Sequence, residues 1–139
     1  IEDNHLKDLK QIGYVTNYVE EALRRAWQQR LNATFIEIEV ETPQEAIIAA
    51  ETFKIFQVSS QTSSEIPCVV MLDNMLPEEI SEIWKELQKR NLHNLVLLEA
   101  SGGISIENIS SYAKVGVDII SLGSLTHSPK ALDINQTVL

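Results

Sequence analysis

The sequence predicts an α/β fold in which parallel strands alternate with helices. Stretches with strand composition alternate along the chain with stretches of helical periodicity. Two strand candidates, residues 67–72 and 95–98, are continuous apolar runs, as expected for parallel strands that are buried on both faces. Strands joined by crossover helices pair in parallel, so an open doubly wound sheet and part of a barrel both fit, and periodicity does not choose between them.

The first helix and strand are expected over residues 17–30 and 34–40. Val19 and Leu23 lie at helical spacing, and Asn17, followed three residues later by an acid, resembles a capping box. Residues 34–40 alternate in polarity and include β-branched side chains, which predicts a strand.

A second helix is expected to begin at Pro43 and to end near Phe53. Thr42 would cap it, proline suits the first turn, and Glu45 stands at the third position. The segment 54–66 that follows has five serine and threonine residues and the least regular pattern, so we expect a solvent-exposed loop there.

The second half continues the alternation. The expected elements are, in order, a strand over 67–72, a helix over 77–90, a strand over 94–98, a helix over 105–114 and a strand over 117–122. Residues 131–138 remain ambiguous, and among residues 1–6 only Ile1 could end a strand.

The length of 139 residues suggests a single domain or a piece of a larger one. The chain begins with Ile rather than Met, so we expect a trimmed or partial chain that forms one partial α/β domain over residues 1–139.

Composition excludes several classes of partner. The net charge of −9 disfavours nucleic acid and anionic membranes. No apolar run approaches the length of about 20 residues needed to span a bilayer, and no signal peptide is visible. The single cysteine, Cys68, lies in an apolar run and is expected to be a core residue in a reducing compartment. We therefore expect a cytoplasmic or organelle-stromal protein that is not secreted.

Carboxylates and Gly/Ser pairs fall where the expected strands end. In chain order they are Glu39, Asp73, Ser101 with Gly102 and Gly103, and Gly123 with Ser124. The carboxyl ends of parallel strands share one edge, which carries the active site of α/β folds. The alternative is that Asp73 and Asn74 form a turn and that Glu39 is a solvated strand end, but the joint placement favours a site.

The chemistry of this edge suits a sugar phosphate. Two glycines between a strand and a helix let backbone N–H groups approach a phosphate, and Ser101 adds a hydroxyl, although most such pairs are plain turns. Glu39 and Asp73 could accept hydrogen bonds from ribose hydroxyls or share a Mg²⁺ ion that neutralises a diphosphate. His127, near the second glycine loop, could touch substrate or be structural.

Seven motifs, in order along the chain, resemble the quinolinate phosphoribosyltransferase family. They are I-E-D-N-H at 1–5, I-E-I-E-V-E at 36–41, M-L-D-N-M at 71–75, L-E-A-S-G-G-I at 98–104, G-V-D-I-I at 116–120, G-S-L-T-H-S at 123–128 and A-L-D-I at 131–134. The resemblance implies the later part of an incomplete α/β barrel, without the family's N-terminal sandwich domain.

The resemblance also implies an activity. Phosphoribosyl pyrophosphate would react with quinolinate, with Mg²⁺ and no organic cofactor, to give nicotinate mononucleotide, pyrophosphate and CO₂. Glu39 and Asp73 would hold ribose hydroxyls or metal. The 5′-phosphate would be held by Ser101, Gly102, Gly103 and Gly123.

One residue departs from the family's pattern, and its charge opposes this activity. The family's first motif has a substrate-binding lysine where this chain has Glu2. A carboxylate facing a dianionic substrate can cost several kcal/mol, and the family's arginine-rich half is absent from the chain. We therefore expect the isolated chain to be inactive, and to need a homo-oligomer or a partner that supplies cations. The alternative is a non-catalytic homologue kept as a structural or interaction module.

Overall fold

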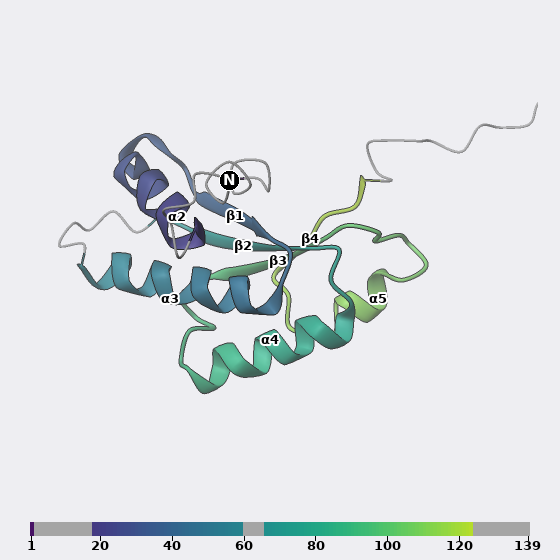
Figure 1. The fold of residues 1–139 in the computed structure, drawn as a ribbon. Coiled ribbons are helices and arrows are strands. Elements are labelled where there is room, and N and C mark those ends of the chain that lie inside the picture. Colours follow the sequence, from purple (N-terminus) through teal and green to yellow (C-terminus); the bar gives the residue numbers. More distant parts are fainter. Residues whose placement is uncertain (2–17, 60–65, 124–139) are drawn as a thin grey trace, which may run out of the picture.

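The computed structural model describes residue 1 and residues 18–59 and 66–123. In this part the chain forms one parallel sheet of four strands in the order β1-β2-β3-β4, with helices between the strands (Figure 1). The predicted α/β fold is confirmed, and the open sheet is consistent with part of a barrel. The elements are α2 (Tyr18–Gln28), the 3₁₀ turn η1 (Arg30–Asn32), β1 (Ile36–Val40), α3 (Pro43–Ser59), β2 (Cys68–Asp73), α4 (Pro77–Lys89), β3 (Leu97–Ser101), α5 (Ile109–Tyr112) and β4 (Ile119–Ile120).

The register of the strands gives the sheet two unlike faces. Ile38 of β1 pairs with Val70 of β2, which pairs with Leu98 of β3, and all three are buried on the face that α3 and α4 cover. Side chains alternate between faces along a strand. The opposite face therefore carries the charged and polar residues of the strands, namely Glu37, Glu39, Asp73, Glu99 and Ser101.

Ile1 extends the sheet beyond β1. Its nitrogen donates to the Glu37 carbonyl oxygen over 2.7 Å, and its carbonyl oxygen accepts from the Glu39 N–H over 3.0 Å. Ile1 thus bonds to the two residues on either side of Ile38, which is the hydrogen-bond pattern of parallel strands. The expectation that Ile1 could end a strand is thus supported by a parallel pairing on the open side of β1.

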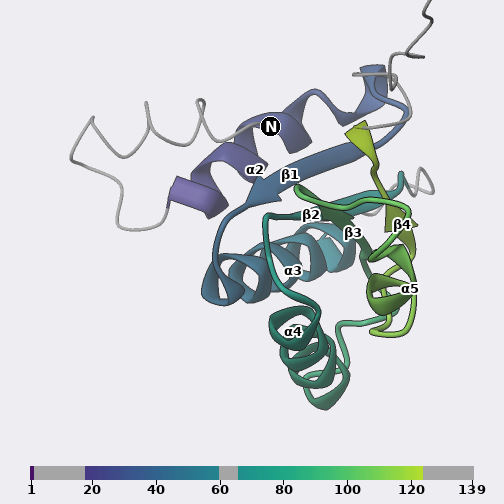
Figure 2. The same ribbon diagram turned by 90° about the vertical axis from the view of Figure 1, so that its right-hand side faces the viewer.

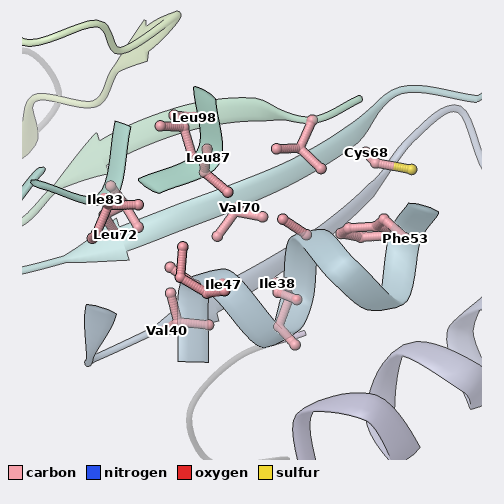
Figure 3. Packing of buried hydrophobic residues seen from close by; sticks show 14 of the residues in the cluster. Ile38, Val40, Ile47, Phe53, Cys68, Val70, Leu72, Ile83, Leu87 and Leu98 are labelled. Carbon is pink, nitrogen blue, oxygen red and sulfur yellow. The ribbon is translucent and has the colours of Figure 1, made fainter. Parts of the chain in front are cut away.

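The core lies between the sheet and the helices. α3 and α4 lie side by side along one face, and α2 lies next to α3 and β1 (Figure 2). Figure 3 shows Ile47 of α3 and Leu87 of α4 meeting Val70 at the middle of the sheet. Full burial of such a side chain contributes about 1.5–3 kcal/mol, so this layer is the main source of stability.

Both long helices begin as their sequences predict. Thr42 Oγ1 accepts the Glu45 N–H over 3.3 Å, which confirms the cap expected before Pro43. At α4, Glu79 Oε2 accepts the Leu76 N–H over 2.8 Å, so an acid in the first turn satisfies a donor that the helix leaves free.

The segment 54–66 is partly helical, where the sequence predicts a loop. α3 continues to Ser59, because its last turns find tertiary partners. Phe56 stacks on Trp27 of α2, and Gln57 Nε2 donates to the Leu95 carbonyl oxygen over 3.1 Å. Residues 60–65 lie outside the described part.

Three expected elements differ in extent. β3 runs from Leu97 to Ser101 rather than over 94–98, so the edge residues sit at the end of a strand rather than after it. α5 is four residues long instead of spanning 105–114, and β4 covers two residues instead of 117–122. The ambiguous residues 131–138 lie outside the described part.

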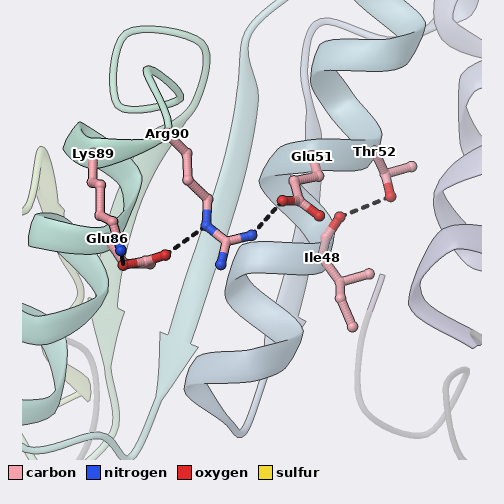
Figure 4. Close-up of polar contacts among 6 residues, drawn as sticks. All are labelled: Ile48, Glu51, Thr52, Glu86, Lys89 and Arg90. Carbon is pink, nitrogen blue, oxygen red and sulfur yellow. Dashed lines mark hydrogen bonds and ion pairs between the residues drawn. The ribbon is translucent and has the colours of Figure 1, made fainter.

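Ion pairs on the surface contribute less to stability than the buried layer does. Arg90, after α4, pairs with Glu86 over 2.7 Å and with Glu51 of α3 over 2.6 Å, which links the two helices (Figure 4). Exposed pairs of this kind stabilise little. None of the helices in the described residues is long and apolar enough to cross a bilayer.

Cys68 is the buried core residue that the sequence predicts. Burial raises the pKa of its thiol to about 11, against a weaker opposing hydrogen bond from Gln57. The thiol is therefore neutral at physiological pH and is a poor nucleophile.

Candidate active site

The carboxyl ends of β1, β2 and β3 bring three of the predicted site residues to one edge of the sheet. Asp73 pairs with Ser101 at the ends of β2 and β3, and Glu39 lies on β1 beside Met71. All three side chains project from the face away from the helices, by the alternation of the strands. We call this edge, with Gly102 and Gly103, the carboxyl rim.

The link from β2 to α4 is hydrogen-bonded to the end of β3. The Asn74 N–H donates to the Ser101 carbonyl oxygen over 2.9 Å, and Asn74 Nδ2 donates to Asp73 Oδ2 over 2.6 Å. Asn74 has a φ of 54°, the left-handed region that asparagine tolerates better than most residues. Asp73 is the last residue of β2 and Asn74 forms the bend that follows it, and the hydrogen bond from Asn74 holds the Asp73 carboxylate at the rim.

Gly102 and Gly103 both require the conformational freedom of glycine. Their φ values are +84° and +62°. A Cβ on Gly102 would lie 2.6 Å from Asn74 Cγ and 2.8 Å from the Asn74 backbone nitrogen, whereas the space around Gly103 is open. The loop therefore packs tightly against Asn74 on one side and is open at Gly103, which suits backbone approach to a ligand.

The structure corrects one part of the expected phosphate site. The sequence predicts a helix over 105–114, closely following the two glycines. Instead the Ser105 N–H donates to Asn108 Oδ1 over 2.8 Å, and Asn108 Nδ2 donates to the Gly103 carbonyl oxygen over 3.1 Å. These bonds favour a turn, and the four-residue helix α5 begins only at Ile109. The donors available to a phosphate are therefore the backbone N–H groups of the glycine loop.

The second glycine loop is described only at its start. The Ser121 N–H donates to the Ala100 carbonyl oxygen over 2.9 Å, so the chain after β4 is still bonded to β3. The exposed Gly123 follows two residues later, near the same edge. Three predicted site residues, Glu2, Ser124 and His127, lie outside the described residues.

Sequence reasoning missed a pair of carboxyl groups below the rim. Glu99 of β3 is 5% exposed, accepts a hydrogen bond from the Ser121 hydroxyl, and is hydrogen-bonded to Glu37 of β1. The alternation of side chains along β1 could have revealed Glu37, because it lies two residues before Glu39 and therefore on the same face. Nothing local marks Glu99, whose partners come from β1 and from the segment after β4.

The environment of Glu37 raises its pKa. Burial is the largest cause, followed by the charge of Glu99 and the hydrogen bond to it, and the amino group of Ile1 partly offsets these effects. The native state therefore keeps the Glu37 carboxyl group protonated to a higher pH than the unfolded chain does.

We expect Glu37→Gln to stabilise the chain at neutral pH and to have less effect near pH 4. A raised native pKa means that stability falls as pH rises from the unfolded value of 4.5 through the native one. Glutamine keeps a donor toward Glu99 and removes the titration. Urea unfolding between pH 4 and pH 7 checks this, with Glu78→Gln on exposed α4 as the control. A pH-independent difference would contradict the raised pKa.

Among the described residues, no lysine or arginine belongs to the strands that form this face. Every described lysine and arginine lies on a helix, on η1 or within two residues after a helix. The described residues also hold no group of three or more His, Cys, Asp or Glu side chains that could bind a metal ion. The rim supplies acceptors and backbone donors, so any further positive charge must come from elsewhere.

The chain resembles known proteins over nearly its whole length. The family model described as "Quinolinate phosphoribosyl transferase, C-terminal domain" matches residues 1–136. The chain belongs to this family.

Relatives of this transferase domain come from distant organisms. The chain is 36% identical over 135 residues to a protein named "Probable nicotinate-nucleotide pyrophosphorylase [carboxylating]" from Methanothermobacter thermautotrophicus, covering 97% of this chain and 41% of the relative. It is 31% identical over 135 residues to the human protein named "Nicotinate-nucleotide pyrophosphorylase [carboxylating]", covering 97% and 38%.

A solved structure shows the same fold. The nicotinate-nucleotide pyrophosphorylase from Francisella tularensis matches with a TM-score of 0.65 and 28% identity, over 96% of this chain and 37% of that one. The chain thus spans about two fifths of the length of the curated relatives it matches, and corresponds to their quinolinate phosphoribosyl transferase C-terminal domain.

Proposed function

We propose that this chain is the part of a carboxylating nicotinate-nucleotide pyrophosphorylase that binds the ribose 5-phosphate moiety of phosphoribosyl pyrophosphate. The observation that supports this most is the joining of Asp73 to the Ser101–Gly103 loop at one edge of the sheet. That arrangement offers acceptors for sugar hydroxyls next to backbone donors for a phosphate, which are the two requirements of a sugar phosphate.

The reaction proposed is the one in the names of the relatives. The pyridine nitrogen of quinolinate bonds to C1 of the ribose as the C1–O bond to pyrophosphate breaks. The 2-carboxylate then leaves as CO₂, and a proton from water takes its place on the ring carbon. In this scheme Glu39 and Asp73 accept hydrogen bonds from the ribose hydroxyls and fix the position of C1. The N–H groups of Gly102, Gly103 and Gly123, with the Ser101 hydroxyl, hold the 5′-phosphate.

Mg²⁺ would enter with the diphosphate. Two carboxylates on neighbouring strands fit an ion that keeps several waters and is otherwise held by substrate phosphates. When bound, the ion would supply positive charge to neutralise the pyrophosphate. Glu39 and Asp73 are the residues of this chain that would hold it.

Quinolinate and pyrophosphate need cations that the described residues do not place at the rim. The proposal therefore includes a source of arginine and lysine side chains, either in a further part of the protein or in a second subunit. Such a source would also cover the carboxylate-bearing face of the sheet, where Glu37 and Glu39 are half-buried.

Calorimetric titration of the 139-residue chain tests this proposal. Ribose 5-phosphate should bind at least tenfold more tightly than ribose or inorganic phosphate, because it alone engages both parts of the rim (a tenfold ratio is about 1.4 kcal/mol). Asp73→Asn should remove most of that advantage, whereas Glu78→Gln on α4 should keep it. Equal affinity for ribose 5-phosphate and phosphate, or no heat for either, would contradict the proposed function.

A further inference from the structure

One residue connects the two halves of the carboxyl rim. Asn74 lies directly after β2, and it contacts Asp73 through its side chain and Ser101 through its backbone. No site prediction included it, because asparagine after a strand is typical of an ordinary turn.

The side chain of Asn74 sets the direction of the Asp73 carboxylate. Its Nδ2 donates to Oδ2 over 2.6 Å, so one carboxylate oxygen is fixed and the other remains for a further partner. The bond is charge-assisted, the stronger class of hydrogen bond. Without it, Asp73 would turn freely at the end of β2.

The same residue supports the glycine loop. The Asn74 N–H holds the Ser101 carbonyl oxygen at 2.9 Å, and its side chain and backbone nitrogen occupy the space next to Gly102 where a Cβ would project. The left-handed φ of 54° lets Asn74 make all these contacts at once. Most other side chains would be strained at this φ.

The geometry points to Asn74 as a positioning residue that holds the ribose-binding carboxylate of Asp73 and the phosphate-binding loop 101–103 in one fixed arrangement. This inference rests on the proposed function and deepens it. Asn74 does not touch the sugar phosphate; it acts through Asp73 and Gly102.

Asn74→Gly tests the side chain while keeping the backbone. Glycine adopts the left-handed conformation and retains the N–H bond to Ser101, so the turn should persist. The matched control is Asn91→Gly, since Asn91 also has a φ of 54° and a bonded N–H but lies between α4 and β3, at the opposite end of the sheet.

The expected result is a loss of ribose 5-phosphate affinity of about tenfold in Asn74→Gly and no change in Asn91→Gly. The affinity for inorganic phosphate, which would contact only the loop, should fall by a smaller factor. In an Asp73→Ala background, Asn74→Gly should weaken ribose 5-phosphate only by that smaller factor, because Asn74 then has no carboxylate to orient.

The outcomes separate the inference from the function on which it rests. Failure of the unmodified chain to bind ribose 5-phosphate would reject the proposed function, and the inference with it. Normal binding by the unmodified chain together with unchanged affinity in Asn74→Gly would reject the inference alone. So would an equal loss with and without Asp73, or a loss of thermal stability without a loss of affinity, since both would indicate a merely structural role.

Discussion

Gly102→Val is expected to abolish ribose 5-phosphate binding in calorimetry. The φ of +84° is a region that a β-branched residue does not adopt without strain, and the new Cβ would meet Asn74 Cγ at 2.6 Å. Either the loop or Asn74 must move, so the backbone N–H groups and the Asp73 carboxylate lose their common arrangement. Strained backbone of this kind costs about 1–3 kcal/mol before the steric clash is added, so the chain should also be less stable.

Gly116→Val separates lost stability from lost binding. Gly116 has a φ of +91°, and a Cβ there would meet Trp84 of α4 at 2.9 Å, so its replacement causes the same two kinds of strain. The residue lies before β4, at the opposite end of the sheet from the carboxyl rim. We expect it to lower stability and to leave binding intact in the folded fraction. Full ribose 5-phosphate affinity in Gly102→Val would show that the loop is not the phosphate site.

The isolated 139-residue chain is expected to form no detectable nicotinate mononucleotide from quinolinate and phosphoribosyl pyrophosphate. None of the described lysines and arginines lies on a strand, whereas the carboxyl rim carries Glu39 and Asp73. A dianionic substrate approaching this rim meets like charge, which can cost several kcal/mol. Glu2 adds one more negative charge to the chain, at the position where the resemblance implies a lysine.

Chromatographic assay of the product, with and without Mg²⁺, checks this expectation. Glu2→Lys alone should not produce turnover, because one cation cannot replace a set that binds both quinolinate and pyrophosphate. Turnover by the unmodified chain would show that its own residues complete the site, and turnover by Glu2→Lys would trace the deficit to that single position.

Local signals in the sequence predicted the order of elements and the position of the rim. Thr42, Pro43 and Glu45 specify the start of α3 by capping chemistry that acts within one turn, and the structure confirms it. Asp73 and Ser101 lie at the ends of parallel strands, and parallel pairing alone brings them together. These predictions succeeded because each depends on neighbours in the chain or on one general rule of topology.

The features that sequence reasoning missed depend on tertiary partners. The strand expected over 94–98 stops before Glu99, yet Ser121 and Glu37 satisfy the Glu99 carboxyl group inside the sheet. The end of α3 was placed too early, because Gln57 is anchored by Leu95, which is distant in sequence. From the sequence, Asn74 is typical of a turn residue, and only the packing of Gly102 against it reveals a further role.

The central claim, that this rim holds a sugar phosphate, is tested most directly by mapping backbone amides of the labelled 139-residue chain during titration with ribose 5-phosphate. We expect saturable shifts of the Ser101, Gly102, Gly103 and Gly123 amides, which flank the ends of β3 and β4. Inorganic phosphate should shift the same amides more weakly. Shifts confined to His93 or to residues 54–59 of α3, or none at all, would contradict the claim.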